Sequence, residues 1–214
     1  MRAPRGAAPA GQRDSSKERS RTAVRVIGGV LGGRRLATVR GRTTRPTAER
    51  VREALFARLE SRYGLHGARL LDLFAGTGAL AIEALSRGAE SVVCVDSDAE
   101  AARVLRSNVA ACGLEGRVRV LERDFRAAAD GLAGDRRRFG GVFLDPPYGR
   151  GLGGAALEYT ADCGLLMSSA WASVEHERRE SLPAEVGGLV RVREDRYGDT
   201  MLSLYEYQRE GERH

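Results

Sequence analysis

The sequence predicts an α/β fold built on a mostly parallel sheet, and three patterns lead to this prediction. From residue 68 onward, short apolar runs alternate with helical segments, as in repeated strand–helix units. Several of these runs end at glycine or at an acidic residue, as strands do before a turn. Near the C-terminus, the alternating segments 189–194 and 200–207 flank Tyr197-Gly198-Asp199 and predict an antiparallel hairpin. Together the patterns predict a seven-stranded sheet that ends in this hairpin.

The predicted elements of the main domain follow in order. Strands are expected at 69–73, 91–95, 118–121, 142–144 and 170–175, and helices at 79–87, 98–112, after Asp124 and at 155–162. Gly88 and Gly113 are placed to end the first two helices, and Asp98 is placed to cap the second. We expect this main domain to cover residues 61–209.

The N-terminal part is predicted to differ from the main domain. Residues 1–22 are rich in Pro, Gly, Ser and Arg without apolar periodicity, which indicates a disordered basic tail. Segments 24–29 and 34–39 surround Gly32-Gly33 and predict a small β-hairpin, and a helix is expected at 48–60. Residues 23–60 would therefore form a hairpin-and-helix extension.

Composition limits the class of protein. No run of 18 or more apolar residues exists to cross a membrane, and the N-terminus has no apolar signal core. Cys94, Cys112 and Cys163 are widely spaced and unpaired, as reduced thiols of a cytoplasmic protein are. The three histidines form no cluster, so we expect no metal site.

The net charge of +6 conceals an asymmetry. Residues 1–60 hold 15 Lys and Arg against 5 Asp and Glu, a balance of +10, whereas residues 61–214 hold 20 against 24, a balance of −4. A basic head on a mildly acidic body indicates a polyanionic partner such as nucleic acid. Lys17 is the only lysine, so a genomic bias toward arginine explains the use of Arg but not the scarcity of acids in the head.

A glycine-rich turn follows the first strand of the main domain. Gly76 and Gly78, within Asp72-Leu73-Phe74-Ala75-Gly76-Thr77-Gly78, allow a tight turn and a close backbone approach to a ligand. Asp96 ends the second strand, where a carboxylate can accept both hydroxyls of a ribose. This is a Rossmann-like nucleotide site. The run from Gly76 also fits a dinucleotide fingerprint, but Asp72 would repel a pyrophosphate and suits a cationic amine.

Asp124 follows the third strand and has two interpretations. Its carboxylate could accept a hydrogen bond from the amino group of an adenine, or it could cap the helix that follows.

The fourth strand runs into Asp145-Pro146-Pro147-Tyr148, and neither proline can continue a ladder. This places an acid, a rigid turn and an aromatic ring at the carboxyl edge of the sheet, where ligands bind in open α/β folds. The tetrapeptide resembles motif IV of S-adenosylmethionine-dependent methyltransferases that act on exocyclic amines. Asp145 and the Pro146 carbonyl could accept the two amine hydrogens, and Tyr148 could stack on the base. An ordinary strand-ending turn is the alternative.

Over residues 24–208, the chain resembles the small-subunit ribosomal RNA guanine-N2 methyltransferase D family. The specific blocks are Val26-Ile27-Gly28-Gly29 with Gly33-Arg34-Arg35-Leu36, and Thr44-Arg45-Pro46-Thr47 continuing through Arg50-Val51-Arg52-Glu53-Ala54-Leu55-Phe56. The resemblance implies a Rossmann-like methyltransferase fold. It implies S-adenosyl-L-methionine contacts at Asp72, Phe74, Gly76, Gly78, Asp96, Asp124 and Thr47, and a base site at Asp145, Pro146 and Tyr148.

The resemblance also implies methyl transfer to guanine N2 in 16S ribosomal RNA of the small ribosomal subunit. We expect a cytoplasmic monomer whose head contacts RNA through Arg25, Arg34, Arg35 and Arg45. Competing interpretations are an adenine-N6 or cytosine-N4 methyltransferase of DNA or RNA, a non-catalytic RNA-binding module, and an NAD oxidoreductase.

Overall fold

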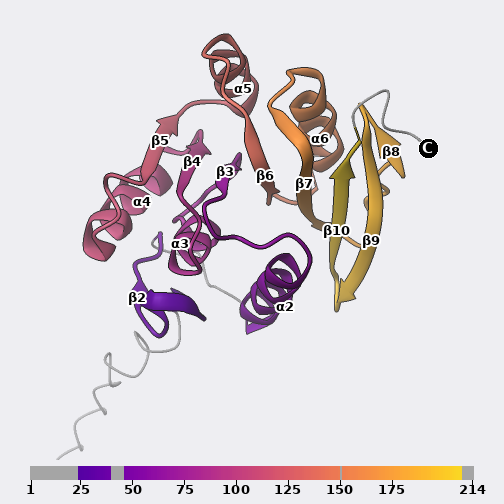
Figure 1. Ribbon diagram of the computed structural model, residues 1–214. Coiled ribbons are helices and arrows are strands. Elements are labelled where there is room, and N and C mark those ends of the chain that lie inside the picture. The colour runs from indigo at the N-terminus through magenta and orange to yellow at the C-terminus, as the bar shows by residue number, and fades with distance from the viewer. Residues whose placement is uncertain (1–23, 40–45, 150, 209–214) are drawn as a thin grey trace, which may run out of the picture.

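An eight-stranded sheet forms the centre of the molecule, in the order β5-β4-β3-β6-β7-β10-β9-β8. The computed structural model describes residues 24–39, 46–149 and 151–208 (Figure 1). Strands β5, β4, β3, β6 and β7 run parallel to one another. Strands β10, β9 and β8 are each antiparallel to the strand before them in this order. The mostly parallel sheet and the C-terminal hairpin are therefore confirmed.

The strands agree with the predicted positions, but one strand is added and several ends differ. The strand before Asp145 begins three residues earlier than predicted, and the first strand of the C-terminal hairpin ends three residues later. Their bounds are β3 Arg69–Asp72, β4 Ser91–Asp96, β5 Val118–Glu122, β6 Phe139–Leu144, β7 Leu166–Glu177, β8 Glu185–Val186, β9 Leu189–Tyr197 and β10 Thr200–Tyr207. The two-residue edge strand β8 was not predicted and makes the sheet eight-stranded. Strand β7 starts four residues earlier than predicted, because its first residues pair across a register shift opposite Phe139 and Gly141.

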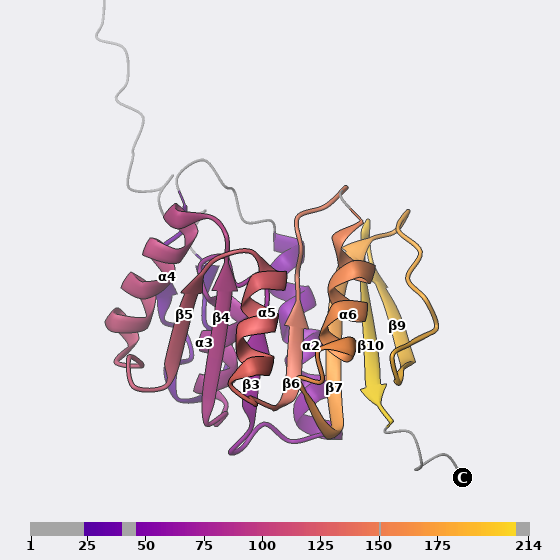
Figure 2. The ribbon, with the colours of Figure 1, turned by 90° about the horizontal axis from the view of Figure 1, so that it is seen from above.

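Helices cover both faces of the sheet. Their bounds are α2 Pro46–Arg62, α3 Ala79–Ser86, α4 Ala99–Cys112, α5 Phe125–Gly134 and α6 Leu152–Asp162. Helices α2, α3 and α4 share one apolar cluster, whereas α5 and α6 pack into the cluster on the opposite face (Figures 1 and 2). Asp98 caps α4 by accepting hydrogen bonds from two backbone N–H groups, as predicted.

The N-terminal hairpin is present but shorter than predicted. Strands β1 Val24–Arg25 and β2 Arg35–Leu36 pair antiparallel, and a 3-10 turn, η1 Gly29–Leu31, lies between them. The strands are short because the N–H groups of Ile27 and Gly28 donate to the Glu83 carboxylate of α3, at 2.6 and 2.9 Å, instead of to a facing strand. The loop therefore binds to the main domain through backbone groups.

Close packing of this loop on α3 depends on Gly29. Its φ is 74°, in the left-handed region, and a Cβ added there would lie 2.0 Å from the Ser86 carbonyl oxygen. Ser86 Oγ accepts from the Leu31 N–H and donates to the Gly28 carbonyl oxygen. The glycines of the Ile27-Gly28-Gly29 block thus have a packing role at the end of α3.

Some sequence-based predictions lie outside the described residues. These are the disordered tail at 1–22, Arg45, and the side chain of Thr47. Within the described ranges, no helix combines the length and the apolar character needed to cross a membrane.

Candidate functional site

Three acidic residues meet at the carboxyl edge of the parallel strands. Asp72 ends β3, Asp96 ends β4, and Asp145 follows β6. Because β3 lies between β4 and β6 in parallel register, these strand ends lie side by side. The sequence predicted all three positions, and the fold brings them to the edge where α/β proteins bind ligands.

Asp72 is buried, with 1% of its surface exposed. It accepts a hydrogen bond from the Phe74 backbone, yet its Oδ1 atom has no partner among the described residues. Burial, and secondarily the charge of Asp96, raises the pKa of Asp72 to about 7. An unpartnered buried acceptor is unfavourable, and a cationic donor such as a methionyl amino group would complete it.

Asp96 holds the glycine-rich turn. Its Oδ2 atom accepts from the Gly76 N–H at 2.7 Å, and its Oδ1 atom accepts from the Asp98 N–H at 2.8 Å. Each carboxylate oxygen retains a second acceptor site for a ribose hydroxyl. The turn is therefore ordered by the same residue that would bind the nucleoside.

The two glycines of this turn differ in role. Both have positive φ, 53° at Gly76 and 84° at Gly78. A Cβ on Gly78 would lie 2.1 Å from Leu105 Cδ1 of α4, so Gly78 is needed for packing. Gly76 has no atom within 4 Å of its Cβ position, so it leaves open space beside the strand ends.

The turn after β5 carries an acid, Asp124, that is exposed instead of buried like Asp72. Asp124 is exposed and caps α5 by accepting from the Arg126 N–H at 2.9 Å, which confirms the capping interpretation and leaves its second oxygen for a ligand. Phe125 is buried, and its ring centroid lies 5.3 Å from that of the half-buried Phe74. Phe74 is therefore the aromatic residue open to a ligand. Together with Asp72, Asp96 and Gly76, these groups fit S-adenosylmethionine.

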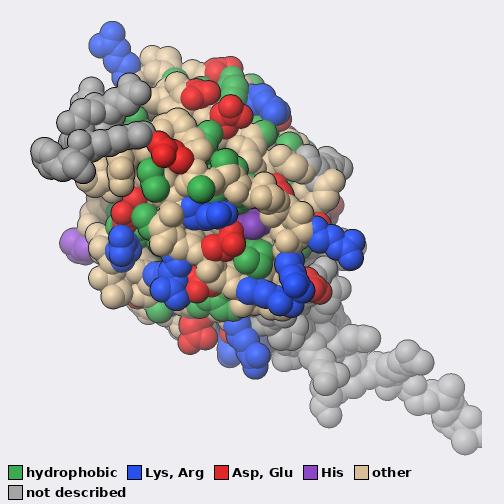
Figure 3. All heavy atoms as spheres, turned by 90° about the vertical axis from the view of Figure 1, so that its right-hand side faces the viewer, with side chains coloured by type: hydrophobic (Ala, Val, Ile, Leu, Met, Phe, Trp, Pro, Cys, Tyr) green, Lys and Arg blue, Asp and Glu red, His purple; other side chains and the backbone are tan. Residues whose placement is uncertain are grey.

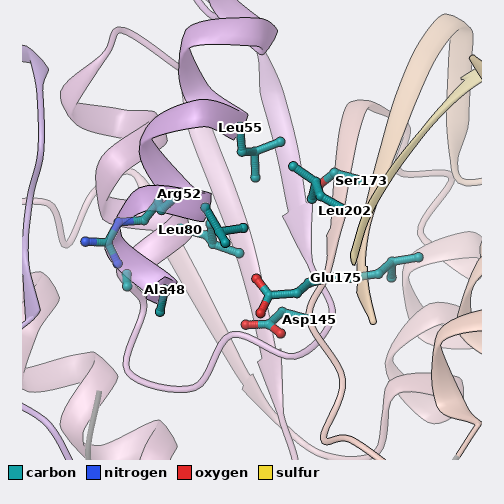
Figure 4. Close-up of a pocket in the computed structure, with 11 residues that line it drawn as sticks. Ala48, Arg52, Leu55, Leu80, Asp145, Ser173, Glu175 and Leu202 are labelled. Carbon is teal, nitrogen blue, oxygen red and sulfur yellow. The ribbon is translucent and has the colours of Figure 1, made fainter. Parts of the chain in front are cut away.

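A pocket lies between α2 and the sheet beside Asp145 (Figure 4). Asp145 and Glu175 supply its carboxylates, and Arg52 lines its other side. The remaining walls are mostly apolar and come from α2, α3, β6, β7 and β10: Ala48, Val51, Leu55, Ala79, Leu80, Leu144, Ser173 and Leu202. Glu175 and Arg52 were not predicted as site residues.

A signal in the sequence could have identified Glu175 but not Arg52. Glu175 ends the predicted fifth strand, in the same position that singled out Asp72, Asp96 and Asp145. Arg52 lies in the block from Arg50 to Phe56, where its burial depends on contacts that the sequence does not show.

The charges of neighbouring acidic residues act on Asp145. Burial, then the charges of Glu175 and Asp72, raise the pKa of the Asp145 carboxyl well above its usual range. The residue nonetheless has an exposed surface, and the opening to solvent moderates this effect. Pro146, the next residue, is buried, and its ring restricts the backbone at the strand end.

Tyr148 is anchored by its hydroxyl group. The hydroxyl donates to Glu175 Oε1 at 2.7 Å and lies 3.2 Å from Thr200 Oγ1. The residue keeps 37% of its surface exposed, so the ring remains open to a stacking partner. The Asp-Pro-Pro-Tyr turn is thus tied to β7 and β10.

Arg52 is buried, and one of its nitrogens lacks a partner. Its NH2 donates to the Arg25 carbonyl oxygen at 2.7 Å, whereas Nε has no hydrogen bond among the described residues and lies 4.0 Å from Glu83 Oε2. Burial lowers the pKa of Arg52, and the charges of Glu83, Glu49 and Glu175 partly offset this effect. Arg52 therefore joins the hairpin to the pocket.

The arginines predicted to contact RNA are placed differently from one another. Arg25 forms an ion pair with Glu49 at 2.8 Å, Arg34 donates to the Ala111 carbonyl of α4, and Arg35 is exposed. On the face shown in Figure 3, cationic and acidic side chains are interspersed. Ion pairs of the C-terminal hairpin include Arg58–Asp195, Arg62–Glu206, Arg191–Glu194 and Arg193–Asp195.

Comparisons with known proteins agree with this architecture. The family described as conserved hypothetical protein 95 matches residues 24–206. A Bacillus subtilis protein, YlbH, which bears the provisional name of an rRNA methyltransferase, is 38% identical over 86% of this chain and 98% of its own length. Ribosomal RNA small subunit methyltransferase D of Escherichia coli is 35% identical over 88% of this chain and 92% of its own length.

A solved structure shows the same fold. The Escherichia coli protein yhhF, provisionally described as a methyltransferase, superposes with a TM-score of 0.75 at 33% identity and covers 87% of this chain and 98% of its own. The resemblance found in the sequence is confirmed over nearly all of the described residues. The chain belongs to the conserved hypothetical protein 95 family, that of ribosomal RNA small subunit methyltransferase D, and is an S-adenosylmethionine-dependent methyltransferase.

Proposed function

We propose that this enzyme methylates the exocyclic N2 of a guanine in 16S ribosomal RNA of the small ribosomal subunit. The names of its relatives support the ribosomal RNA substrate. The observation that carries the proposal is Asp145-Pro146-Pro147-Tyr148 at the end of β6, beside Asp72, whose Oδ1 atom has no partner among the described residues. An acceptor amine and a methyl donor would then share one edge of the sheet.

We assign S-adenosylmethionine to the turn after β3. Asp72 would bind its amino group, and Asp96 its ribose hydroxyls. Phe74, Gly76, Gly78, Asp124 and Thr47 complete the proposed cofactor contacts. When bound, the cofactor supplies an electrophilic methyl group on a sulfonium. Positioning the two reactants in line can provide about 7–11 kcal/mol of the rate acceleration in favourable systems.

Asp145, Pro146 and Tyr148 would act on the acceptor. An aromatic amine is a poor nucleophile because its lone pair is delocalised into the ring. Asp145 and the Pro146 carbonyl would accept the two N–H hydrogens and direct the lone pair outward. Stacking of the base on Tyr148 would contribute about 1–3 kcal/mol. The target should be unpaired or flipped, since guanine N2 lies on the Watson–Crick edge.

The N-terminal extension, residues 23–60, would contact the RNA backbone through Arg25, Arg34, Arg35 and Arg45, while residues 61–209 form the catalytic domain. The basic balance of the head supports this assignment. We further propose a monomer that acts in the cytoplasm, where small-subunit RNA is available.

Nucleoside analysis tests the product directly. Small-subunit particles from a strain lacking this gene are incubated with purified enzyme and labelled S-adenosylmethionine, and the RNA is digested for mass spectrometry. N2-methylguanosine is the expected product. N6-methyladenosine or N4-methylcytidine would overturn the substrate assignment, and absence of any methylated nucleoside in both RNA and particles would overturn the proposed activity.

A further inference from the structure

The pocket contains a second carboxylate that the motif does not explain. Strands β6 and β7 are parallel and pair Leu144 with Val174, so the residues that follow, Asp145 and Glu175, are neighbours. Figure 4 shows their carboxyl groups side by side at the centre of the pocket. Asp145 and the Pro146 carbonyl already suffice to accept the two N–H hydrogens of one amine, so a second acid is not needed for that role.

Glu175 is held in a fixed orientation. Its Oε1 atom accepts the hydrogen bond from the Tyr148 hydroxyl at 2.7 Å. Its Oε2 atom has no hydrogen-bond partner among the described residues, and apolar side chains such as Leu55 and Leu202 line the same pocket. One oxygen is therefore committed to positioning, and the other is available to a ligand.

The electrostatics of the pair indicate what kind of ligand would fit. Burial raises the pKa of Glu175, and burial together with Glu175 raises that of Asp145. Arg52 is the cation that lowers the pKa of Glu175. Carboxylates in an apolar pocket are unfavourable unless hydrogen-bond donors satisfy them. Two side-by-side carboxylates fit a ligand edge that presents two neighbouring donors.

Among the bases with an exocyclic amine, guanine alone has that edge. Its 2-amino group is adjacent to a protonated ring nitrogen, N1–H. In adenine and cytosine, the ring nitrogen beside the amine on the Watson–Crick edge carries a lone pair instead. An ionised carboxylate can only accept hydrogen bonds, so it attracts the first arrangement and repels the second.

We propose that Glu175 is a specificity-determining residue: its free carboxylate oxygen accepts the N1–H of guanine while Asp145 binds the 2-amino group. This inference rests on the proposed guanine-N2 activity and explains how the pocket would select that amine. A site built to hydrogen-bond one group rejects an analogue lacking it by large factors, because its own polar atoms are then left unpaired.

2-Aminopurine provides the test, because it keeps the 2-amino group and replaces N1–H by a lone pair. The target guanine is first located by nucleoside analysis. It is then replaced by 2-aminopurine through splinted ligation, and kcat/KM is measured on both RNAs. We expect wild-type enzyme to favour guanine by at least 100-fold. Glu175→Gln should reduce this ratio at least tenfold, since the amide can donate to the lone pair and still accept from Tyr148.

Glu177→Gln is the matched control, because it neutralises an acid on the same strand that does not line the pocket. It should leave the ratio unchanged, and Glu175→Gln should bind S-adenosylmethionine within twofold of wild type.

The outcomes separate this inference from the proposed activity. Formation of N2-methylguanosine with equal turnover of both RNAs, or an unchanged ratio in Glu175→Gln, would overturn the role of Glu175 and leave the activity standing. Loss of both activities in Glu175→Gln, or a tenfold loss of cofactor affinity, would place this residue in catalysis or cofactor binding and overturn the inference. Methylation of adenine or cytosine by wild type would overturn both proposals.

Discussion

At the scale of single residues, the site is dominated by carboxyl groups whose pKa values burial raises above the ordinary range. Asp72, Asp145 and Glu175 all have raised pKa values, and burial is the largest cause in each. Such groups are concentrated at functional sites because binding a cation or donor relieves their cost. Each residue can therefore be tested for a separate contribution to binding, turnover and stability.

We predict that Asp145→Ala reduces turnover at least tenfold and leaves folding and cofactor affinity nearly unchanged. The proposed role of Asp145 is on the acceptor amine, so the donor should bind as before. Single-turnover kinetics and calorimetry with S-adenosylmethionine measure the two effects. An exposed acid on α6, Glu158, provides the control as Glu158→Ala. Retention of more than a tenth of wild-type activity would remove Asp145 from catalysis.

The acid limb of the pH profile should report the environment of Asp145. Its pKa is raised, so the carboxylate needed for turnover is lost as pH falls through a value above the ordinary range. We expect kcat/KM to decline at higher pH than for an ordinary carboxyl. Because Glu175 raises this pKa, Glu175→Gln should move the limb to lower pH. A limb that does not move would show that the two carboxyls are not coupled.

Asp72→Asn should make the ligand-free protein more stable than wild type, by a margin that grows as pH rises. The folded pKa is about 7 against an ordinary value of 3.8. The folded state therefore holds a proton that the unfolded chain releases, so stability is lost between about pH 4 and pH 7. The shift corresponds to at most about 4 kcal/mol. Thermal unfolding of the ligand-free forms from pH 5 to pH 8 measures it, and parallel curves for wild type and variant would contradict the prediction.

Asp96→Ala should weaken S-adenosylmethionine binding at least tenfold. The loss is that of a charge-assisted hydrogen bond to the ribose, worth about 1.5–3 kcal/mol. The Gly76 N–H would also lose its acceptor. Calorimetry with NAD and S-adenosylmethionine measures both affinities, and tight binding of NAD alone would reject the cofactor assignment.

At the scale of elements, the hairpin loop and α3 depend on each other. The Glu83 carboxylate is fully buried and is satisfied by the backbone of the loop and by Arg87. Gly29 allows this approach by having no side chain. The loop is therefore fixed by backbone contacts, and its sensitivity to substitution depends on where a new atom would be placed.

We predict that Gly29→Ala destabilises the protein by at least about 2 kcal/mol more than Gly33→Ala. Both residues have positive φ, 74° and 83°, so each variant incurs the left-handed cost of about 1–2 kcal/mol. Only the Gly29 variant meets backbone atoms, because Gly33 has nothing within 4 Å of its Cβ position. Urea unfolding compares the two, and equal destabilisation would show that the loop can move off α3.

The sequence was sufficient for features that are local in the chain. Strand–helix alternation and the residues at strand ends predict the parallel sheet, Asp72, Asp96 and Asp145. Features that arise from distant contacts were missed. Neither the burial of Arg52 nor the acceptance of the Ile27 N–H by Glu83, 56 residues away, has a local signature. The predicted hairpin was too long for the same reason, since the N–H groups of Ile27 and Gly28 bond to Glu83 of α3 instead of to a facing strand.

At the scale of the whole molecule, some arginines are paired with acidic side chains and others are not. Arg191 and Arg193 of the C-terminal hairpin are paired with acids, whereas Arg35 is exposed on the N-terminal hairpin. The basic balance of the first 60 residues therefore offers charge to a polyanion more readily than the C-terminal hairpin does.

Replacing Arg34 and Arg35 by Ala should weaken RNA binding and reduce the salt slope by about 0.7–0.9 for each phosphate that the protein no longer neutralises. Arg193→Ala should leave the slope unchanged, because Arg193 is already paired with Asp195. Titrations with small-subunit RNA at several salt concentrations give the slopes. If all variants share the wild-type slope, these arginines are solvated residues of the hairpin.

The attachment of the hairpin to α3 and α4 also has a consequence for the order of synthesis. The hairpin leaves the ribosome early, yet its bonds reach Glu83, Ser86, Asn108 and Ala111, up to 77 residues later in the chain. Contacts of such separation form late, after their partners exist. A nascent chain that ends before α4 cannot present Arg34 and Arg35 in their native arrangement. The proposed RNA-binding surface therefore comes into being only with a folded methyltransferase core beneath it.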